Sequence, residues 1–138
     1  MLVEDQDGLR TAVCKYLQKS GYQVDTFSHV DAAFDAITQG LLPDLIVTDV
    51  IMPGLDGYQL LKRVRADPRL CGVPVVLLTA RGLSDDRIVG YNAGASAYVS
   101  KPFEPEELLS VVNAQLTNAR LAHVHIPAAS PQKNRGKE

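Results

Sequence analysis

Polar side chains that suit phosphoryl or metal chemistry follow four short apolar runs of this sequence. They are Glu4 and Asp5, then Asp49, then Thr79, and finally Lys101. If the four runs are parallel strands, their carboxyl ends meet at one edge of a sheet, where open α/β sheets bind their ligands. Three carboxylates packed together repel one another unless a cation shares the site. Oxygen ligands favour Mg²⁺ or Ca²⁺, and a small acidic pocket left open to water and a phosphoryl group suits Mg²⁺ better.

Asp49 is the residue on which this chemistry is centred. It ends the run 44–49, which holds three consecutive apolar residues, the pattern of a strand buried on both faces. With a metal present, the Asp49 carboxylate can attack phosphorus as a nucleophile and become an acyl phosphate. Taken alone, an Asp ahead of the Pro53-Gly54 turn is equally typical of a turn residue. The functional interpretation therefore depends on the whole group of residues.

The other members of the group have complementary roles. The ammonium group of Lys101 can pair with the incoming phosphoryl charge and with the carboxylate of Asp49. The hydroxyl of Thr79 and the backbone N–H of Ala80 can each donate a hydrogen bond to a phosphoryl oxygen. Positioning and charge neutralisation do most of the work in such a transfer. Singly, these residues are more typical of a strand end and a loop.

Five apolar runs alternate with five amphipathic segments along the chain. The expected strands span 1–4, 22–27, 44–49, 73–78 and 97–100, and the expected helices end near residues 20, 40, 66, 94 and 121. This alternation predicts one doubly wound α/β domain, (βα)5, with a five-stranded parallel sheet and helices on both faces. The usual strand order for this element count is 2-1-3-4-5, the flavodoxin-like order. Strands 1, 3, 4 and 5 then lie side by side.

Local sequence signals give finer expectations. Gly21 is expected to end the first helix in the left-handed conformation, and Ser28 to cap the second. Ser84-Asp85-Asp86 is expected to begin the fourth helix. In the third helix, the apolar residues are expected to face the core and the basic ones to face solvent. The apolar set is Leu60, Leu61 and Val64, and the basic set is Lys62, Arg63 and Arg65.

Length and composition limit the protein class. A chain of 138 residues with 46% hydrophobic content can bury one sizeable core. Its net charge of -2, from 14 basic and 16 acidic residues, gives no electrostatic reason for direct nucleic-acid binding. No apolar run approaches the roughly 20 residues of a membrane span, and the acidic start does not resemble a signal peptide. We therefore expect no membrane association and a cytoplasmic location.

The cysteines and the end of the sequence complete the organisation. Cys14 and Cys71 each fall in a predicted helical segment without metal-ligand spacing, which favours two free thiols in a reducing compartment. Residues 1–121 are expected to form one domain. Residues 122–138 are small, polar and proline-containing, as in a flexible C-terminal tail or a truncated linker.

At these motifs the sequence resembles the receiver domains of two-component response regulators, over residues 1 to about 120. The matching stretches are VED at 3–5, DVIMPGLDG at 49–57, LLTA at 77–80, GA at 94–95 and YVSKPF at 98–103. The stretches 86–91 and 100–103 look most like those of cyanobacterial and plastid regulators. That finer resemblance makes the plastid stroma an alternative location.

The resemblance implies a phosphorelay function. A sensor histidine kinase or a phosphotransfer protein would donate a phosphoryl group to Asp49. Mg²⁺ would be held by Asp5, Asp49 and the backbone carbonyl of Ile51, with Glu4 contributing through water. Such a domain is not an enzyme beyond slow hydrolysis of its own acyl phosphate, in which side chains such as Ile51 and Arg81 govern the access of water.

The resemblance also implies a conformational switch. Phosphorylation would draw Thr79 toward the phosphoryl group and turn Tyr98 inward. The surface of helix 4, strand 5 and helix 5 would then change and be read by a downstream effector, with control of transcription as one output, or by a second copy of the domain. Ser96 and Ala97 stand where many winged-helix regulators carry acids, which argues against a dimer built on such acids.

Two other functions compete with the phosphorylated switch. A Mg²⁺-dependent phosphatase with Asp49 as its nucleophile would need a second acid two residues later, where the chain has Ile51. A protein-interaction module that is never phosphorylated remains an alternative, although the complete set of acids, threonine and lysine argues against it.

The first strand also begins at Met1, several residues short of the usual family length.

Overall fold

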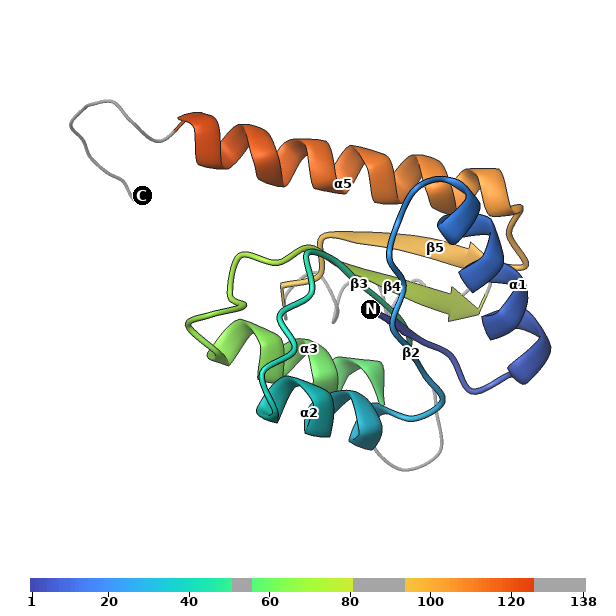
Figure 1. Cartoon of the computed structure of the whole chain (residues 1–138), viewed down its shortest axis with the longest axis horizontal. Helices are drawn as coiled ribbons and strands as arrows, with labels where there is room; N and C mark the ends of the chain where they lie inside the picture. The colour runs from blue at the N-terminus through green and yellow to red at the C-terminus, as the bar shows by residue number, and fades with distance from the viewer. Residues whose placement is uncertain (51–55, 81–93, 126–138) are drawn as a thin grey trace.

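The centre of the structure is a parallel β-sheet, seen in a computed structural model that describes residues 1–50, 56–80 and 94–125 (Figure 1). Its strands are β1 (Leu2–Val3), β2 (Thr26–Phe27), β3 (Ile46–Asp49), β4 (Val75–Ala80) and β5 (Ala97–Lys101). They are ordered β2-β1-β3-β4-β5, and all four pairings are parallel. The predicted strand order is therefore confirmed.

Helices cover both faces of this sheet. They are α1 (Asp7–Lys19), α2 (Val30–Thr38), α3 (Gly57–Ala66) and α5 (Pro105–His125). Helices α1 and α5 lie on one face, and α2 and α3 lie on the other (Figure 1). The predicted doubly wound α/β fold is thus confirmed. The helix expected over 84–94 falls outside the described residues, apart from Gly94.

The two faces bury separate apolar clusters, which explains the continuous apolar runs of the central strands. In β3, Ile46 packs with the α2–α3 cluster and Val47 with the α1–α5 cluster. In β4, Val75 and Val76 divide between the two faces in the same way. Successive side chains of a strand point to opposite faces of the sheet. When both faces are buried, apolar residues therefore follow one another without alternating with polar residues.

Several helix ends follow the predicted chemistry. Gly21 and Gly40 adopt φ of 100° and 109°, so each occupies the left-handed region expected after a helix. Helix α3 begins with a reciprocal capping box, in which Asp56 Oδ1 accepts from Gln59 N–H at 3.0 Å and Gln59 Oε1 accepts from Asp56 N–H at 2.7 Å. The expected cap of α2 was wrong. The N-cap residue is His29 rather than Ser28, and its side chain makes no capping hydrogen bond.

Two element lengths differ from prediction. Strand β2 covers only Thr26–Phe27 instead of 22–27, because its partner β1 offers only Leu2 and Val3 for pairing. Helix α5 continues to His125 instead of fading near Leu121. Its sequence contains no glycine or proline between Pro105 and Pro127, so no residue in that stretch stops the helix.

Arg65 contradicts the predicted solvent-facing position. Lys62 and Arg63 are exposed, but the Arg65 side chain is half-buried. Its guanidinium donates to the carbonyl oxygens of Gly94 at 2.8 Å, Val73 at 2.6 Å and Cys71 at 3.2 Å. Its Nη2 also lies 3.4 Å from Ser96 Oγ. Arg65 thus ties the last turn of α3 to the segments that precede β4 and β5.

The cysteine prediction was half right. Both Cys14 and Cys71 are free thiols in the described part of the chain. Cys14 lies in α1, as expected. Cys71 lies in the turn after α3 rather than in a helix, because α3 ends at Ala66 and the following Asp67-Pro68 favours an extended backbone.

Candidate functional site

The carboxyl ends of the central strands meet along one edge of the sheet. The register places Val3 beside Thr48 and Asp49 beside Leu78. It also pairs Thr79 with Ser100 and Ala80 with Lys101. Parallel pairing therefore brings together the polar residues that were predicted to converge, although they are up to 97 residues apart in the chain.

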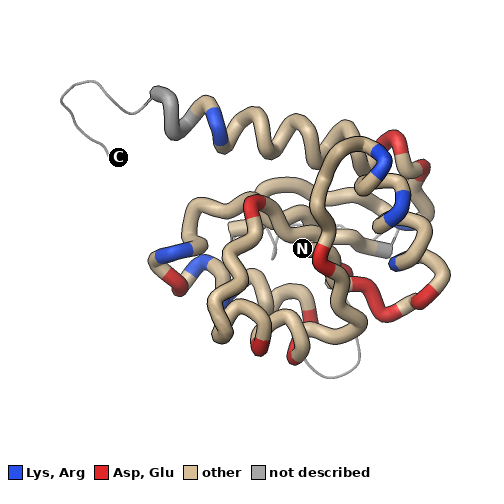
Figure 2. Tube along the Cα trace, in the orientation of Figure 1, with Lys and Arg blue, Asp and Glu red and all other residues tan. Residues whose placement is uncertain are grey.

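Three acids form the core of this edge. Carboxylate oxygens of Glu4, Asp5 and Asp49 all lie within 4.8 Å of one another. Glu4 and Asp49 are only 1% and 3% exposed. Acidic positions also line the turn between β1 and α1 (Figure 2). Buried carboxylates in such proximity are unfavourable without protons or cations to compensate them.

Lys101 supplies part of that compensation. Its Nζ donates a hydrogen bond to Glu4 Oε1 at 2.9 Å and lies 2.6 Å from Asp49 Oδ1 as an ion pair. The other carboxylate oxygen of Glu4 accepts a hydrogen bond from the backbone N–H of Gln6 at 3.1 Å. Both carboxylate oxygens of Glu4 therefore accept hydrogen bonds, whereas Lys101 is the only one of these groups that compensates the charge of Asp49.

The two buried carboxyls differ in their acidity. Burial and then the adjacent Glu4 carboxyl raise the pKa of Asp49 to about 8, against the opposing effect of Lys101. Burial also acts to raise the pKa of Glu4, but its contacts with Asp49, Lys101 and the Gln6 N–H outweigh it and lower that pKa. The pKa of Lys101 is raised, because its two carboxylate partners outweigh its burial. The Asp49 carboxyl is therefore the weaker acid of the two.

Open hydrogen-bonding capacity marks the place where a ligand would fit. Asp49 Oδ2 and the hydroxyl of Thr79 are buried without a hydrogen-bond partner among the described residues, whereas Asp49 Oδ1 lies 2.6 Å from Lys101 Nζ. Buried polar atoms are rarely left in this condition unless a ligand, ion or water completes them. A small oxygen-seeking cation such as Mg²⁺ fits a donor set of three carboxylates, and a phosphoryl group would fit the Thr79 donor.

Of the remaining predicted site residues, Ala80 and Tyr98 lie within the described part of the chain. Ala80 ends β4 beside Lys101, so its backbone lies at the same edge. Tyr98 is half-buried in β5 and packs against the α2–α3 cluster. Ile51 and Arg81 lie outside the described residues.

Sequence reasoning missed two residues that hold the Asp49 backbone. A Cβ atom on Gly57, the first residue of α3, would lie 2.1 Å from the carbonyl oxygen of Asp49. The Gly57 N–H donates to the carbonyl of Val50 at 3.0 Å, so α3 begins directly against this turn. The buried hydroxyl of Thr48 donates to the same Asp49 carbonyl at 3.1 Å. The presence of Gly57 at the end of the DVIMPGLDG stretch was the sequence signal for its close approach to the Asp49 backbone.

With this geometry established, the comparison with known proteins is decisive. Residues 1–113 match the model of the response regulator receiver domain family. This chain belongs to that family. As a receiver domain it is a signalling module of two-component systems rather than an enzyme, and its membership implies a histidine kinase as partner.

Individual relatives agree with the family assignment. The receiver domain is 45% identical over 113 residues to the response regulator Rre1 of Synechocystis sp., covering 81% of this chain and 48% of Rre1. It is 38% identical over 135 residues to ycf29 of Cyanophora paradoxa, named a "probable transcriptional regulator", covering 97% of this chain and 63% of ycf29. The predicted likeness to cyanobacterial and plastid regulators is confirmed. The chain thus spans about half to two thirds of the length of these relatives.

A solved structure supports the same fold. The chemotaxis response regulator CheY4 of Vibrio cholerae matches with a TM-score of 0.76 and 32% identity, over 83% of this chain and 94% of CheY4. Within the described part of the receiver domain, no helix combines the length and apolar character that crossing a membrane requires.

Proposed function

We propose that this receiver domain accepts a phosphoryl group on Asp49 from a sensor histidine kinase or a phosphotransfer protein. The observation that supports this proposal most directly is the state of Asp49 itself. Its carboxylate is buried between Glu4 and Lys101, where Oδ1 lies 2.6 Å from the Lys101 ammonium and Oδ2 has no hydrogen-bond partner among the described residues. A nucleophile needs such an available oxygen, and the nearby cation stabilises its charged form.

Mg²⁺ is the metal that we propose for this site. Asp5 and Asp49 would bind it together with the backbone carbonyl of Ile51, and Glu4 would contribute through water. When bound, the metal neutralises charge on the attacking carboxylate and on the phosphoryl oxygens. The proximity of the three acidic side chains supports this assignment, since their repulsion would be relieved by a divalent cation.

The transfer exchanges one bond to phosphorus for another. An oxygen of Asp49 attacks phosphorus while the bond from phosphorus to the histidine nitrogen breaks, and that nitrogen keeps the electron pair. Lys101 neutralises the charge on Asp49 and on the phosphoryl group. The unpartnered hydroxyl of Thr79 and the N–H of Ala80 donate hydrogen bonds to phosphoryl oxygens. The acyl phosphate is afterwards hydrolysed slowly, with water access governed by Ile51 and Arg81.

The proposed output is a change of surface. Movement of Thr79 toward the phosphoryl group makes room for Tyr98, which lies on the neighbouring strand β5. The surface of residues 84–94, β5 and α5 then presents a new shape to an effector or to a second copy of the domain. The name of ycf29 supports control of transcription as the output. In this proposal the domain itself does not bind nucleic acid, the residues that follow α5 act as a tail or linker, and the protein works in the cytoplasm or plastid stroma.

Mass spectrometry after incubation with acetyl phosphate tests the proposal. We expect the wild-type chain to gain one phosphoryl group in the presence of Mg²⁺ and none in the presence of a chelator. The Asp49→Asn variant should gain none under either condition. A folded wild-type chain that remains unmodified with Mg²⁺ would instead support the alternative of an interaction module that works without phosphorylation.

A further inference from the structure

The carbonyl group of Glu4 lies just beyond the paired part of β1. The ladder with β2 runs through hydrogen bonds from Leu2 N–H to Asp25 O at 2.8 Å and from Glu4 N–H to Phe27 O at 3.0 Å. In a parallel ladder the next donor, toward Glu4 O, would come from the residue two beyond Phe27. That residue is His29, the N-cap of α2, where the chain leaves the sheet.

Arg10 takes the place of the missing strand donor. Its Nη1 donates to the carbonyl oxygen of Glu4 at 2.8 Å, and its Nη2 pairs with Asp7 Oδ1 at 2.5 Å. The Arg10 side chain is only 19% exposed, whereas that of Asp7 is 87% exposed. Because the guanidinium group is planar and rigid, the two bonds together close the turn 4–7 between β1 and α1. That turn carries Glu4 and Asp5.

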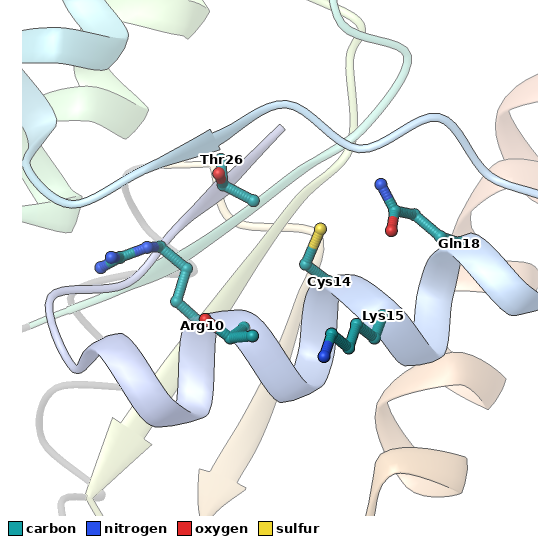
Figure 3. Close-up of a pocket in the computed structure, with 6 residues that line it drawn as sticks. Arg10, Cys14, Lys15, Gln18 and Thr26 are labelled. Carbon is teal, nitrogen blue, oxygen red and sulfur yellow. The ribbon is translucent and has the colours of Figure 1, made fainter.

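A cavity lies beside Arg10, so its side chain borders open space as well as protein. The cavity measures about 210 Å³ and lies between α1 and β2. Arg10, Cys14, Lys15 and Gln18 line it from α1, and Thr26 lines it from β2 (Figure 3). The Arg10 side chain therefore has free space on one side. Removal of its hydrogen bonds would release both the side chain and the turn that it closes.

We propose that Arg10 is a positioning residue for the acidic site, acting through the backbone of Glu4. This inference rests on the proposed function, because the acids that it positions are the proposed Mg²⁺ ligands. Residues that orient the groups contacting a metal commonly change its affinity by 10–100-fold when they are mutated. Arg10 itself touches neither the metal position nor the phosphoryl group. Its loss should therefore weaken metal binding more than it slows transfer at saturating metal.

The test compares Arg10→Met and Arg10→Lys with Lys15→Met. Arg10→Met keeps the aliphatic stem but removes both donors, and Arg10→Lys keeps the charge but loses the planar fork. Lys15 lines the same cavity, so Lys15→Met controls for loss of a nearby positive charge. Isothermal titration calorimetry measures Mg²⁺ affinity directly. The rate of phosphorylation by acetyl phosphate, measured as a function of Mg²⁺ concentration, separates metal affinity from transfer.

We expect Arg10→Met to bind Mg²⁺ about tenfold more weakly and Arg10→Lys about threefold more weakly. Both should have transfer rates within about threefold of wild type at saturating Mg²⁺, and Lys15→Met should match wild type in both measurements. Wild-type affinity in Arg10→Met, or an equal loss in Lys15→Met, would overturn the inference. If Arg10→Met does not fold, wild-type affinity in Arg10→Lys would overturn it. Failure of the wild-type chain to bind Mg²⁺ would instead reject the proposed function along with it.

Discussion

Gly57 approaches the backbone of Asp49 so closely that a Cβ atom at this position would lie 2.1 Å from the Asp49 carbonyl oxygen. The contact is between backbone atoms, so a larger residue could not be accommodated by rotating a side chain. The Cβ atom on Gly57 would also lie 3.0 Å from the Asp49 carbonyl carbon and 3.2 Å from Val50 Cα. The first turn of α3 and the proposed phospho-acceptor residue are therefore parts of one rigid arrangement.

Substitution of Gly57 by alanine should disturb both stability and phosphorylation. The added methyl group must push α3 away from the end of β3, at a cost of about 2 kcal/mol in the free energy of unfolding. We also expect slower phosphorylation, because the Asp49 backbone must shift. Gly8→Ala is the matched control, since Gly8 is in helix α1 and a Cβ there would meet nothing within 4 Å apart from its chain neighbours and the backbone of its own helix. Urea unfolding should find Gly8→Ala as stable as wild type or more stable; equal stability of the two variants would contradict the prediction.

Asp49→Asn should stabilise the metal-free domain more strongly as the pH rises. The pKa of Asp49 is raised to about 8 in the folded state. Its protonated form therefore contributes fully to the free energy of unfolding below the pKa that Asp49 has in the unfolded chain, and this contribution is lost as the pH rises through 8. The variant lacks this titration. Urea unfolding with a chelator should give similar free energies at pH 5 and an advantage for Asp49→Asn on the order of 2 kcal/mol at pH 9. A variant that is less stable than wild type at pH 9 would contradict the crowded arrangement of carboxylates.

Lys101→Met should make the metal-free domain sensitive to alkaline pH. The substitution removes the ammonium group that lies 2.6 Å from Asp49 and 2.9 Å from Glu4. The remaining carboxylates then resist ionisation, so the loss of stability should grow from pH 6 to pH 9 and reach about 2 kcal/mol, since Lys101 is partly solvated. Thermal unfolding across this range measures the effect. Lys62→Met removes an exposed lysine on α3 and should produce no such trend.

Arg65→Met should destabilise the domain far more than Arg63→Met. Arg65 donates to the carbonyls of Gly94, Val73 and Cys71, and its removal leaves acceptors on two segments unpaired. We expect a loss of about 3 kcal/mol in urea unfolding. Arg65→Lys should recover little of it, because one ammonium cannot reproduce the planar fork. Arg63 bonds the exposed Thr38 hydroxyl at 3.1 Å and lies 5.5 Å from the Phe34 ring, so Arg63→Met should cost about 1 kcal/mol or less.

The contrast between Asp49 and Arg65 explains how far the sequence could predict this molecule. Asp49 follows a continuous apolar run, and parallel strands must bring their carboxyl ends to one edge, so its position at the site follows from topology alone. Arg65 stands next to Val64 in α3, and the helical period predicts a solvent-facing residue. Its actual partners are mostly backbone carbonyls that precede β4 and β5, and carbonyl groups leave no signature in residue type.

The same limit applies to the two shortest strands and to Arg10. An alternating pattern over 22–27 predicts a strand, but pairing requires a partner of matching length, and β1 provides only two residues. The sequence also placed Arg10 in a helix without revealing that its guanidinium reaches the Glu4 carbonyl. The positions of the buried apolar residues in the central strands were predicted well. Positions fixed by backbone hydrogen bonds between elements required the structure.

Helix α5 has a mechanical consequence for any signal that passes through it. Its 21 residues, at 1.5 Å of rise each, give a length of roughly 30 Å. The five residues of β5 span only about 17 Å, and the helix extends well beyond the end of the sheet (Figure 1). The helix begins at Pro105, four residues after Lys101, so its first turn lies near the acidic edge. If that turn tilted by about 5°, the far turn would move by roughly 3 Å, so a rigid helix of this length would enlarge a small motion at the site.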